Sequence, residues 1–100
     1  MKYLWEILVP TQFNDGRPIR TRYHRVWDEK VRQISSGLTI LTPAKGQWVS
    51  ENSELFVERM IPVRVACTYE QMVEIANMTK TYYEQEKVMF YRLSDEVHFI

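Results

Sequence analysis

Two β-rich stretches occupy the middle of the chain, residues 37–49 and 55–67, and a short polar segment, residues 50–54, joins them. Apolar runs that flank a polar turn are typical of a β-hairpin. Strand-like segments also occur near both ends, at residues 3–9 and at 88–100, the latter interrupted at 94–96. Segments with helical periodicity separate these strands from the central hairpin. The predicted order of elements is therefore βαββαβ.

Apolar residues recur at helical spacing in two segments. In residues 21–35 the stripe is Tyr23, Trp27, Val31 and Ile34, and Gly37 stands where a left-handed cap would end the helix. The second helix begins at residues 68–71, Thr-Tyr-Glu-Gln, which fit a capping box. Its predicted buried stripe consists of Met72, Ile75, Ala76, Thr79 and Tyr82 or Tyr83. Each helix therefore has one apolar face to place against a sheet.

The element order predicts an α+β fold of the ferredoxin-like type, a four-stranded antiparallel sheet with both helices on one face. Residues 1–100 form a single domain in this prediction. We expect strands 3–9 and 55–67 to be the central pair and to run parallel. Residues 43–46 predict a bulge or bend in the second strand. Pro62 lies midway along a predicted central strand, where it lacks an amide to donate, so we expect a bulge or break there.

Four short motifs resemble a bacterial family known as domain of unknown function 3574: residues 37–41 (Gly-Leu-Thr-Ile-Leu), 46–48 (Gly-Gln-Trp), 58–59 (Glu-Arg) and 85–88 (Gln-Glu-Lys-Val). The resemblance extends over most of the chain. It implies a ferredoxin-like α+β domain. It implies no activity, and therefore no catalytic residues are transferred from it.

Composition limits the possible classes of protein. The 13 basic and 13 acidic residues give zero net charge, so no overall field favours nucleic acid or an anionic membrane. No apolar run approaches the roughly 20 residues that span a bilayer, and the N-terminus does not resemble a signal peptide. The single cysteine, Cys67, cannot form an intramolecular disulfide. We therefore expect a cytoplasmic protein without membrane association.

Helices on one side leave the other face of the sheet open, and Glu6 and Arg64 are predicted to meet on that face. One interpretation is a structural salt bridge on a half-solvated sheet. Another is an enzyme site, with Glu6 as general base and Arg64 binding an anionic substrate. A third is a homodimer in which two open faces pack together and form an α+β barrel around a cavity. Barrels of that type include small enzymes, but a fold alone does not establish an activity.

A basic run precedes and begins the first helix: Arg17, Arg20, Arg22, His24 and Arg25, with Tyr23 among them. Arg20 and Arg22 would lie at the positive end of the helix dipole, an arrangement that an anionic ligand would stabilise. Alternatively, Asp15, Asp28 and Glu29 neutralise the run. The RNA-binding octapeptide of open ferredoxin-like sheets is absent from strand 55–67, which argues against nucleic acid.

Other candidate chemistry is sparse. Trp48 and Glu58 are further candidate ligand-binding residues, although a tryptophan after Gly46 and Gln47 is more often a packing or turn-closing residue. The one cysteine and two histidines match no zinc-binding spacing, and there is no nucleophile elbow, P-loop or dinucleotide fingerprint. We therefore expect no cofactor and no metal.

These observations favour a small binding or interaction module that forms a homodimer through its open sheet face. Two alternatives stay open. One is a small enzyme of the dimeric α+β barrel type that acts on an anionic small molecule, and the other is an anion or nucleic-acid binder that uses the run Arg17–Arg25.

Overall fold

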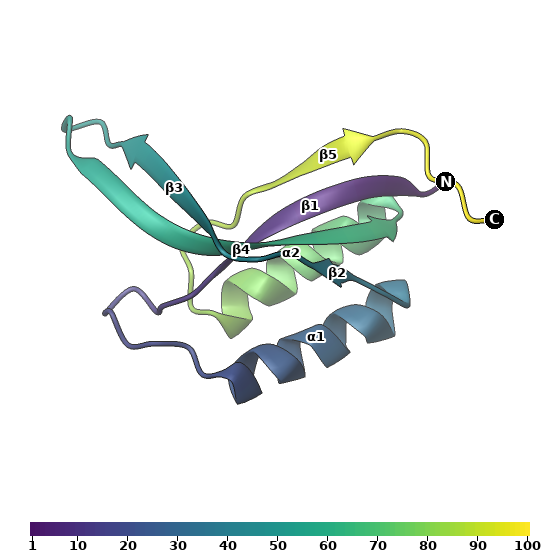
Figure 1. Ribbon diagram of the computed structural model, residues 1–100, viewed down its shortest axis with the longest axis horizontal. Coiled ribbons are helices and arrows are strands. Elements are labelled where there is room, and N and C mark those ends of the chain that lie inside the picture. The colour runs from purple at the N-terminus through teal and green to yellow at the C-terminus, as the bar shows by residue number, and fades with distance from the viewer.

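Two helices, α1 (Thr21–Ser35) and α2 (Tyr69–Tyr82), lie against one face of a single antiparallel sheet (Figure 1). The computed structural model describes residues 1–100. The strands are β1 (Tyr3–Pro10), β2 (Thr39–Ile40), β3 (Ala44–Val49), β4 (Leu55–Cys67) and β5 (Phe90–Ser94). The predicted α+β, ferredoxin-like fold is confirmed. The sheet has five strands rather than four because the predicted second strand is divided into β2 and β3.

The strand order is β2-β4-β1-β5, so β1 and β4 are the central pair, as predicted. Their predicted parallel direction is wrong, because Tyr3 pairs with Cys67 and Pro10 with Met60 in an antiparallel ladder. The reason is the connection through α1. It makes β1 and β2 parallel but leaves a gap between them, and β4 returns from the hairpin to fill that gap.

The bulge predicted at Pro62 is also wrong, since the ladder from Leu8–Pro62 to its neighbours continues without a register shift. The Pro62 carbonyl accepts a hydrogen bond from the Leu41 amide at 2.9 Å, on the side away from β1. The imino nitrogen of Pro62 therefore faces residues 41–43, between the end of β2 and the start of β3. No ladder hydrogen bond is required there, so proline is tolerated in this central strand.

The irregularity lies in the strand opposite Pro62. Ile40 pairs with Val63, and Ala44 pairs with Met60, so residues 41–43 face only Ile61 and Pro62. One extra residue on one strand is a β-bulge, and a bulge bends the strand that contains it. The predicted bend in the second strand is thus confirmed, slightly earlier than the predicted residues 43–46.

The helix ends follow from local chemistry. Thr68 and Gln71 form the predicted capping box, in which Thr68 Oγ1 accepts from the Gln71 amide at 3.1 Å and Gln71 Oε1 accepts from the Thr68 amide at 3.0 Å. At the end of α1 the left-handed residue is Ser36, with φ 75°, and not Gly37 as predicted. Residue 36 is where the Arg32 carbonyl accepts the closing amide, so the turn comes one residue earlier.

The hydrophobic core lies between the sheet and the helices. Alternate residues of β1 and β4 face the helices, and the helical stripes complete the layer. Trp27 of α1 donates from Nε1 to Thr79 Oγ1 of α2 at 2.9 Å, which joins the two helices inside the core. Residues buried to 2% exposure or less include Ile7, Val9, Trp27, Val31, Val63, Val65, Cys67, Met72, Ile75, Thr79 and Tyr83.

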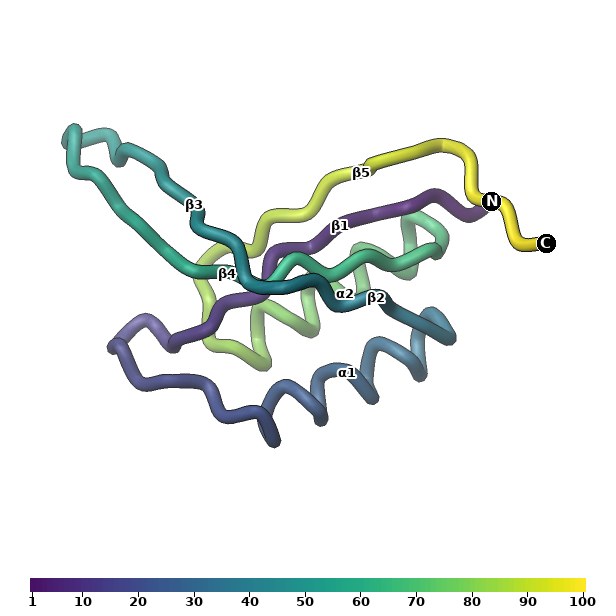
Figure 2. Tube along the Cα trace, viewed as in Figure 1, coloured from purple at the N-terminus to yellow at the C-terminus, as the bar shows by residue number.

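β4 is longer than its neighbour β1, and the excess forms a projecting arm. We define the arm as β3 together with residues 55–59 of β4, which pair with each other but not with β1 (Figure 1). Figure 2 shows the two chain segments of the arm rising away from both helices toward the turn at residues 50–54. All of its residues except Gly46 are exposed.

The C-terminal strand is shorter than predicted. Only Phe90–Ser94 pair with β1, and residues 95–100 form no strand. Neither helix of the structure is long and apolar enough to cross a membrane.

Candidate functional site

Glu6 and Arg64 meet on the open face, the face of the sheet opposite the helices. They are directly paired across β1 and β4, and Arg64 Nε donates to Glu6 Oε1 at 3.1 Å. The second carboxylate oxygen, Oε2, accepts a short hydrogen bond from the Tyr91 hydroxyl of β5. Three neighbouring strands therefore each contribute one side chain to this cluster.

Both oxygens of the Glu6 carboxylate accept a hydrogen bond, and these donors stabilise its ionised form and weaken it as a base. Glu6 is only 8% exposed, whereas the Arg64 side chain is 45% exposed. The hydrogen bond to Glu6 raises the pKa of Tyr91 to about 12, with burial adding to the effect. Tyr91 thus remains a donor at all ordinary pH values, and the cluster holds three strands together.

Sequence reasoning missed Tyr91. The signal was available, because Tyr91 lies opposite Glu6 once β5 is placed beside β1. Register, however, depends on where the strand begins, and the predicted strand began at residue 88 rather than at Phe90.

Trp48 and Glu58 lie on the arm, away from the Glu6 cluster. Glu58 and Arg64 are six residues apart on one strand, about 20 Å at roughly 3.3 Å per residue. The Trp48 ring lies over Gly46, where an added Cβ would come within 3.0 Å of it. Glu58 lines a groove of about 540 Å³ between the arm and the loop after β1. The two residues are exposed and make no side-chain hydrogen bond with each other.

Arg20 and Arg22 lie elsewhere again, at the start of α1. Together with Arg17 and Glu84 they line a cleft of about 890 Å³, which we call the arginine cleft. Its apolar lining comes from Phe13, Pro18, Tyr23, Val26 and Tyr82. The six residues predicted from the sequence are therefore distributed over three separate places rather than one site.

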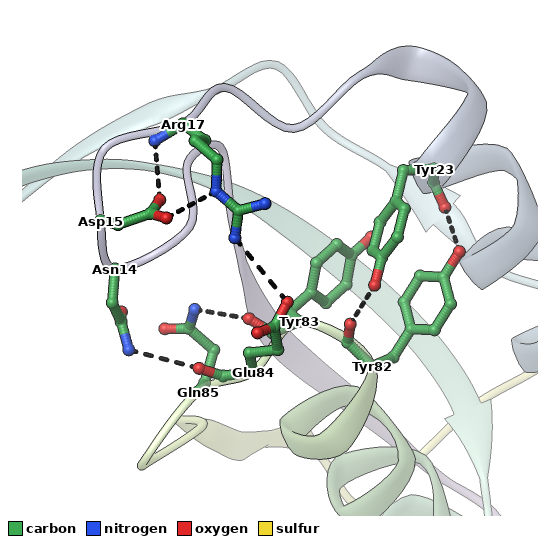
Figure 3. A network of polar contacts seen from close by, with 8 residues as sticks. All are labelled: Asn14, Asp15, Arg17, Tyr23, Tyr82, Tyr83, Glu84 and Gln85. Carbon is green, nitrogen blue, oxygen red and sulfur yellow. Dashed lines mark hydrogen bonds and ion pairs between the residues drawn. The ribbon is translucent and has the colours of Figure 1, made fainter.

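A polar network fixes the walls of the arginine cleft (Figure 3). Asn14 Nδ2 donates to the Glu84 carbonyl at 3.3 Å, and Arg17 lies 2.6 Å from Asp15 and 4.0 Å from Glu84. On the other side, the Tyr82 hydroxyl donates to the Tyr23 carbonyl at 2.9 Å, and the Tyr23 hydroxyl donates to the Tyr82 carbonyl. The loop after β1, the start of α1 and the end of α2 are thus tied together.

Two members of the basic run, His24 and Arg25, do not line this cleft, and His24 points into the helix interface. Its Nδ1 lies 2.7 Å from the hydroxyl of buried Tyr83. Burial lowers the pKa of His24, and the nearby Asp28 carboxylate opposes that shift only in part. His24 is therefore neutral at neutral pH and adds no charge to the arginines.

No three His, Cys, Asp or Glu side chains gather into a group able to hold a metal ion. Cys67 is buried, and this burial raises the pKa of its thiol to about 11. A thiol in that environment stays protonated and is a weak nucleophile.

Comparison with solved structures shows what the fold resembles. The chain aligns with the divalent cation tolerance protein CutA1 from Thermus thermophilus at a TM-score of 0.73 and 12% identity, covering 98% of this chain and 88% of that one. The periplasmic divalent cation tolerance protein CutA from Archaeoglobus fulgidus gives 0.71 and 12%, with 99% and 88% covered. A phage SAM lyase in complex with S-methyl-5'-thioadenosine gives 0.66 and 11%, with 98% and 93% covered. At such identities the likeness shows a shared fold alone.

No family model and no curated protein sequence matches the chain. The resemblance to domain of unknown function 3574 stays a prediction.

Proposed function

We propose that the chain is a small interaction module that self-associates through the open face of its sheet and through the arm. The observation that carries this proposal is an apolar stripe on β4 that continues past the helices to the tip of the arm and is broken there only by Arg59. Val63 and Val65 face the helices and are buried, whereas Val57 and Leu55, on the same side of the strand, are 53% and 62% exposed. The side chains are of core type, but this chain provides no layer to cover them.

The arm carries apolar side chains on both of its faces near the tip, whereas Lys45, Glu58 and Arg59 lie nearer the body. Trp48 pairs with Phe56 on one face, and Val49 pairs with Leu55 on the other. An isolated two-stranded ribbon is marginally stable in water, and a contiguous exposed apolar surface of this kind is typical of an interface. A partner that covers the arm would thus also stabilise it.

The open face offers a matching surface. Leu4, Leu8 and Met60 lie on it half-buried, with Leu93 on the edge strand beside them. The arm projects away from the body of its own chain (Figure 1), so arm and open face cannot cover each other within one chain. A second copy supplies both surfaces at once, which favours self-association over an unrelated partner.

Solution mass tests the proposal directly. Light scattering coupled to size-exclusion chromatography should give two or more times the chain mass of 12.1 kDa. Because a charge on an apolar interface must be desolvated, Val57→Asp and Phe56→Asp should each shift the protein toward monomer.

Asn77→Asp is the matched control, since it adds the same charge on an exposed position of α2 and should leave the mass unchanged. Circular dichroism should be used to check that each variant is folded. A wild-type protein that elutes as a 12.1 kDa monomer at micromolar concentration would overturn the proposal, as would a dissociating effect of Asn77→Asp equal to that of the arm variants.

A further inference from the structure

The arginine cleft lies at the start of α1, away from the open face, and shares only Phe13 with the groove beside the arm, so self-association gives it no role. Its lining includes Arg17, Arg20, Arg22 and one acidic residue, Glu84. Positive charge therefore exceeds negative charge in the cleft, although the whole chain is neutral. A local concentration of one charge within a concave surface attracts ligands of opposite charge.

The arginines of the cleft differ in their partners. Arg17 is engaged, with Asp15 at 2.6 Å and its guanidinium 4.7 Å from the centre of the Phe13 ring. Arg20 and Arg22 form no ion pair and no side-chain hydrogen bond with any residue of the chain. The sequence had left open that Asp15, Asp28 and Glu29 neutralise the run. The structure pairs only Asp15 with it, and only through Arg17.

The rest of the lining is apolar. The arginines are flanked by Phe13, Pro18, Tyr23 and Val26. Val26 is 42% exposed, so an apolar side chain of α1 faces solvent in the cleft. A volume of about 890 Å³ is within the range of roughly 300–1,000 Å³ that small-molecule sites occupy. The cleft thus combines two free guanidinium groups with a surface suited to a flat or aliphatic body.

The walls of the cleft are held before any ligand arrives. The edge-to-face contact between Phe13 and Tyr23, with ring centres 5.4 Å apart, joins the loop after β1 to α1. Tyr23 and Tyr82 stack at 4.2 Å and exchange hydrogen bonds, and Figure 3 shows both rings beside the Arg17 network. A preorganised site loses little conformational entropy on binding, which increases affinity.

We infer that the arginine cleft binds a small phosphate ester, with the phosphate on Arg20 and Arg22 and the organic group against Phe13, Pro18 and Val26. Guanidinium groups bind phosphate through paired, charge-assisted hydrogen bonds, and both are available here. Inorganic phosphate would leave Phe13, Pro18 and Val26 exposed to water, so these apolar residues favour a phosphate ester over free phosphate.

Phenyl phosphate is the probe, with inorganic phosphate and phenol as its two halves. Titration calorimetry should show phenyl phosphate binding more tightly than either half alone. In ¹H–¹⁵N spectra the shifts should concentrate at residues 13–26. Arg20→Ala combined with Arg22→Ala should weaken binding by roughly tenfold or more, because two charge-assisted contacts are lost. Both side chains are exposed, so the fold should survive.

Arg25→Ala is the matched control, because Arg25 belongs to the same run and the same helix but does not line the cleft. It should change the affinity less than twofold. The inference is overturned if phenyl phosphate does not bind at millimolar concentration, or if it binds no better than phosphate and phenol. It is also overturned if Arg25→Ala weakens binding as much as the double variant, as expected for a diffuse surface that holds a polyanion such as single-stranded DNA.

Discussion

At the scale of residues, the open face is organised around the Glu6 carboxylate and its two hydrogen-bond donors, Arg64 and the Tyr91 hydroxyl. Glu6 is nearly buried on a face that has no second layer, and Tyr91 and Arg64 are what satisfy it. A buried carboxylate without partners costs several kcal/mol. Glu6 is therefore tolerated only because β4 and β5 each direct a donor toward it.

The raised pKa of Tyr91 predicts a pH effect on stability. The folded state holds the Tyr91 proton to about pH 12, whereas the unfolded chain releases it near pH 10. The stabilisation is fully present below pH 10 and is lost as the pH rises from 10 to 12. In Tyr91→Phe, urea unfolding at pH 9 and pH 11 should therefore show a smaller loss of stability between the two values than in the wild type.

Tyr69→Phe is the control for that experiment, because Tyr69 is 54% exposed and its hydroxyl makes no hydrogen bond within the chain. It should retain the wild-type difference between pH 9 and pH 11. If Tyr91→Phe retains that difference too, the Tyr91–Glu6 hydrogen bond contributes nothing to stability in solution.

At the scale of elements, the start of α2 was predictable from local sequence, whereas the exact end of α1 was not. The capping box at Thr68 and Gln71 was predictable because its two hydrogen bonds are local. The end of α1 was misplaced by one residue, because glycine favours a left-handed cap but does not fix which residue adopts it. Ser36 takes that conformation, and Gly37 follows it with an ordinary backbone.

The backbone conformations of Ser36 and Gly37 predict different responses to substitution at the two positions. Ser36→Gly should raise the free energy of unfolding by up to about 1 kcal/mol, since a left-handed conformation is strained for serine and free for glycine. Gly37→Ala should be near neutral, because an added Cβ there meets no atom within 4 Å. Thermal and urea unfolding measure both. A destabilised Ser36→Gly, or a loss above about 1 kcal/mol in Gly37→Ala, would contradict the assignment.

Pro62 shows the same limit for strands. A proline within a strand correctly predicted irregular pairing nearby. The sequence alone does not show, however, on which side of the strand the missing amide would point. Here that amide would point toward residues 41–43, so the irregularity belongs to the facing strand. Backbone direction across a sheet is a tertiary property, and this is also why the parallel direction predicted for β1 and β4 was wrong.

For the whole molecule, the fold class was predictable because periodicity identified every helix and nearly every strand. The candidate sites were less so. Strand alternation correctly paired Glu6 with Arg64, because the two lie on adjacent strands in a regular ladder. It gave no indication that Arg20 and Arg22 border a cleft with Tyr82, since that proximity comes from the packing of α1 against α2.

The overall dimensions reflect the arm. The radius of gyration is 14.0 Å and the extents are 45 × 29 × 23 Å, whereas a compact domain of this length has a radius of about 13 Å. An elongated fold with apolar side chains at the tip of its projection leaves those side chains in solvent unless a partner covers them. That is the shape expected if the arm is covered only by a neighbouring copy.

Trp48 gives the arm an optical signal of its own. Of the three tryptophans, Trp5 and Trp27 are 6% and 1% exposed, and Trp48 is 40% exposed. Iodide should therefore quench mainly Trp48 in the separated chain, and Trp48→Phe should remove the quenchable, long-wavelength part of the emission. On concentration the wild-type emission should shift to shorter wavelength as the arm leaves water. Emission that stays constant across the dilution series would mean that the Trp48 face of the arm remains in solvent.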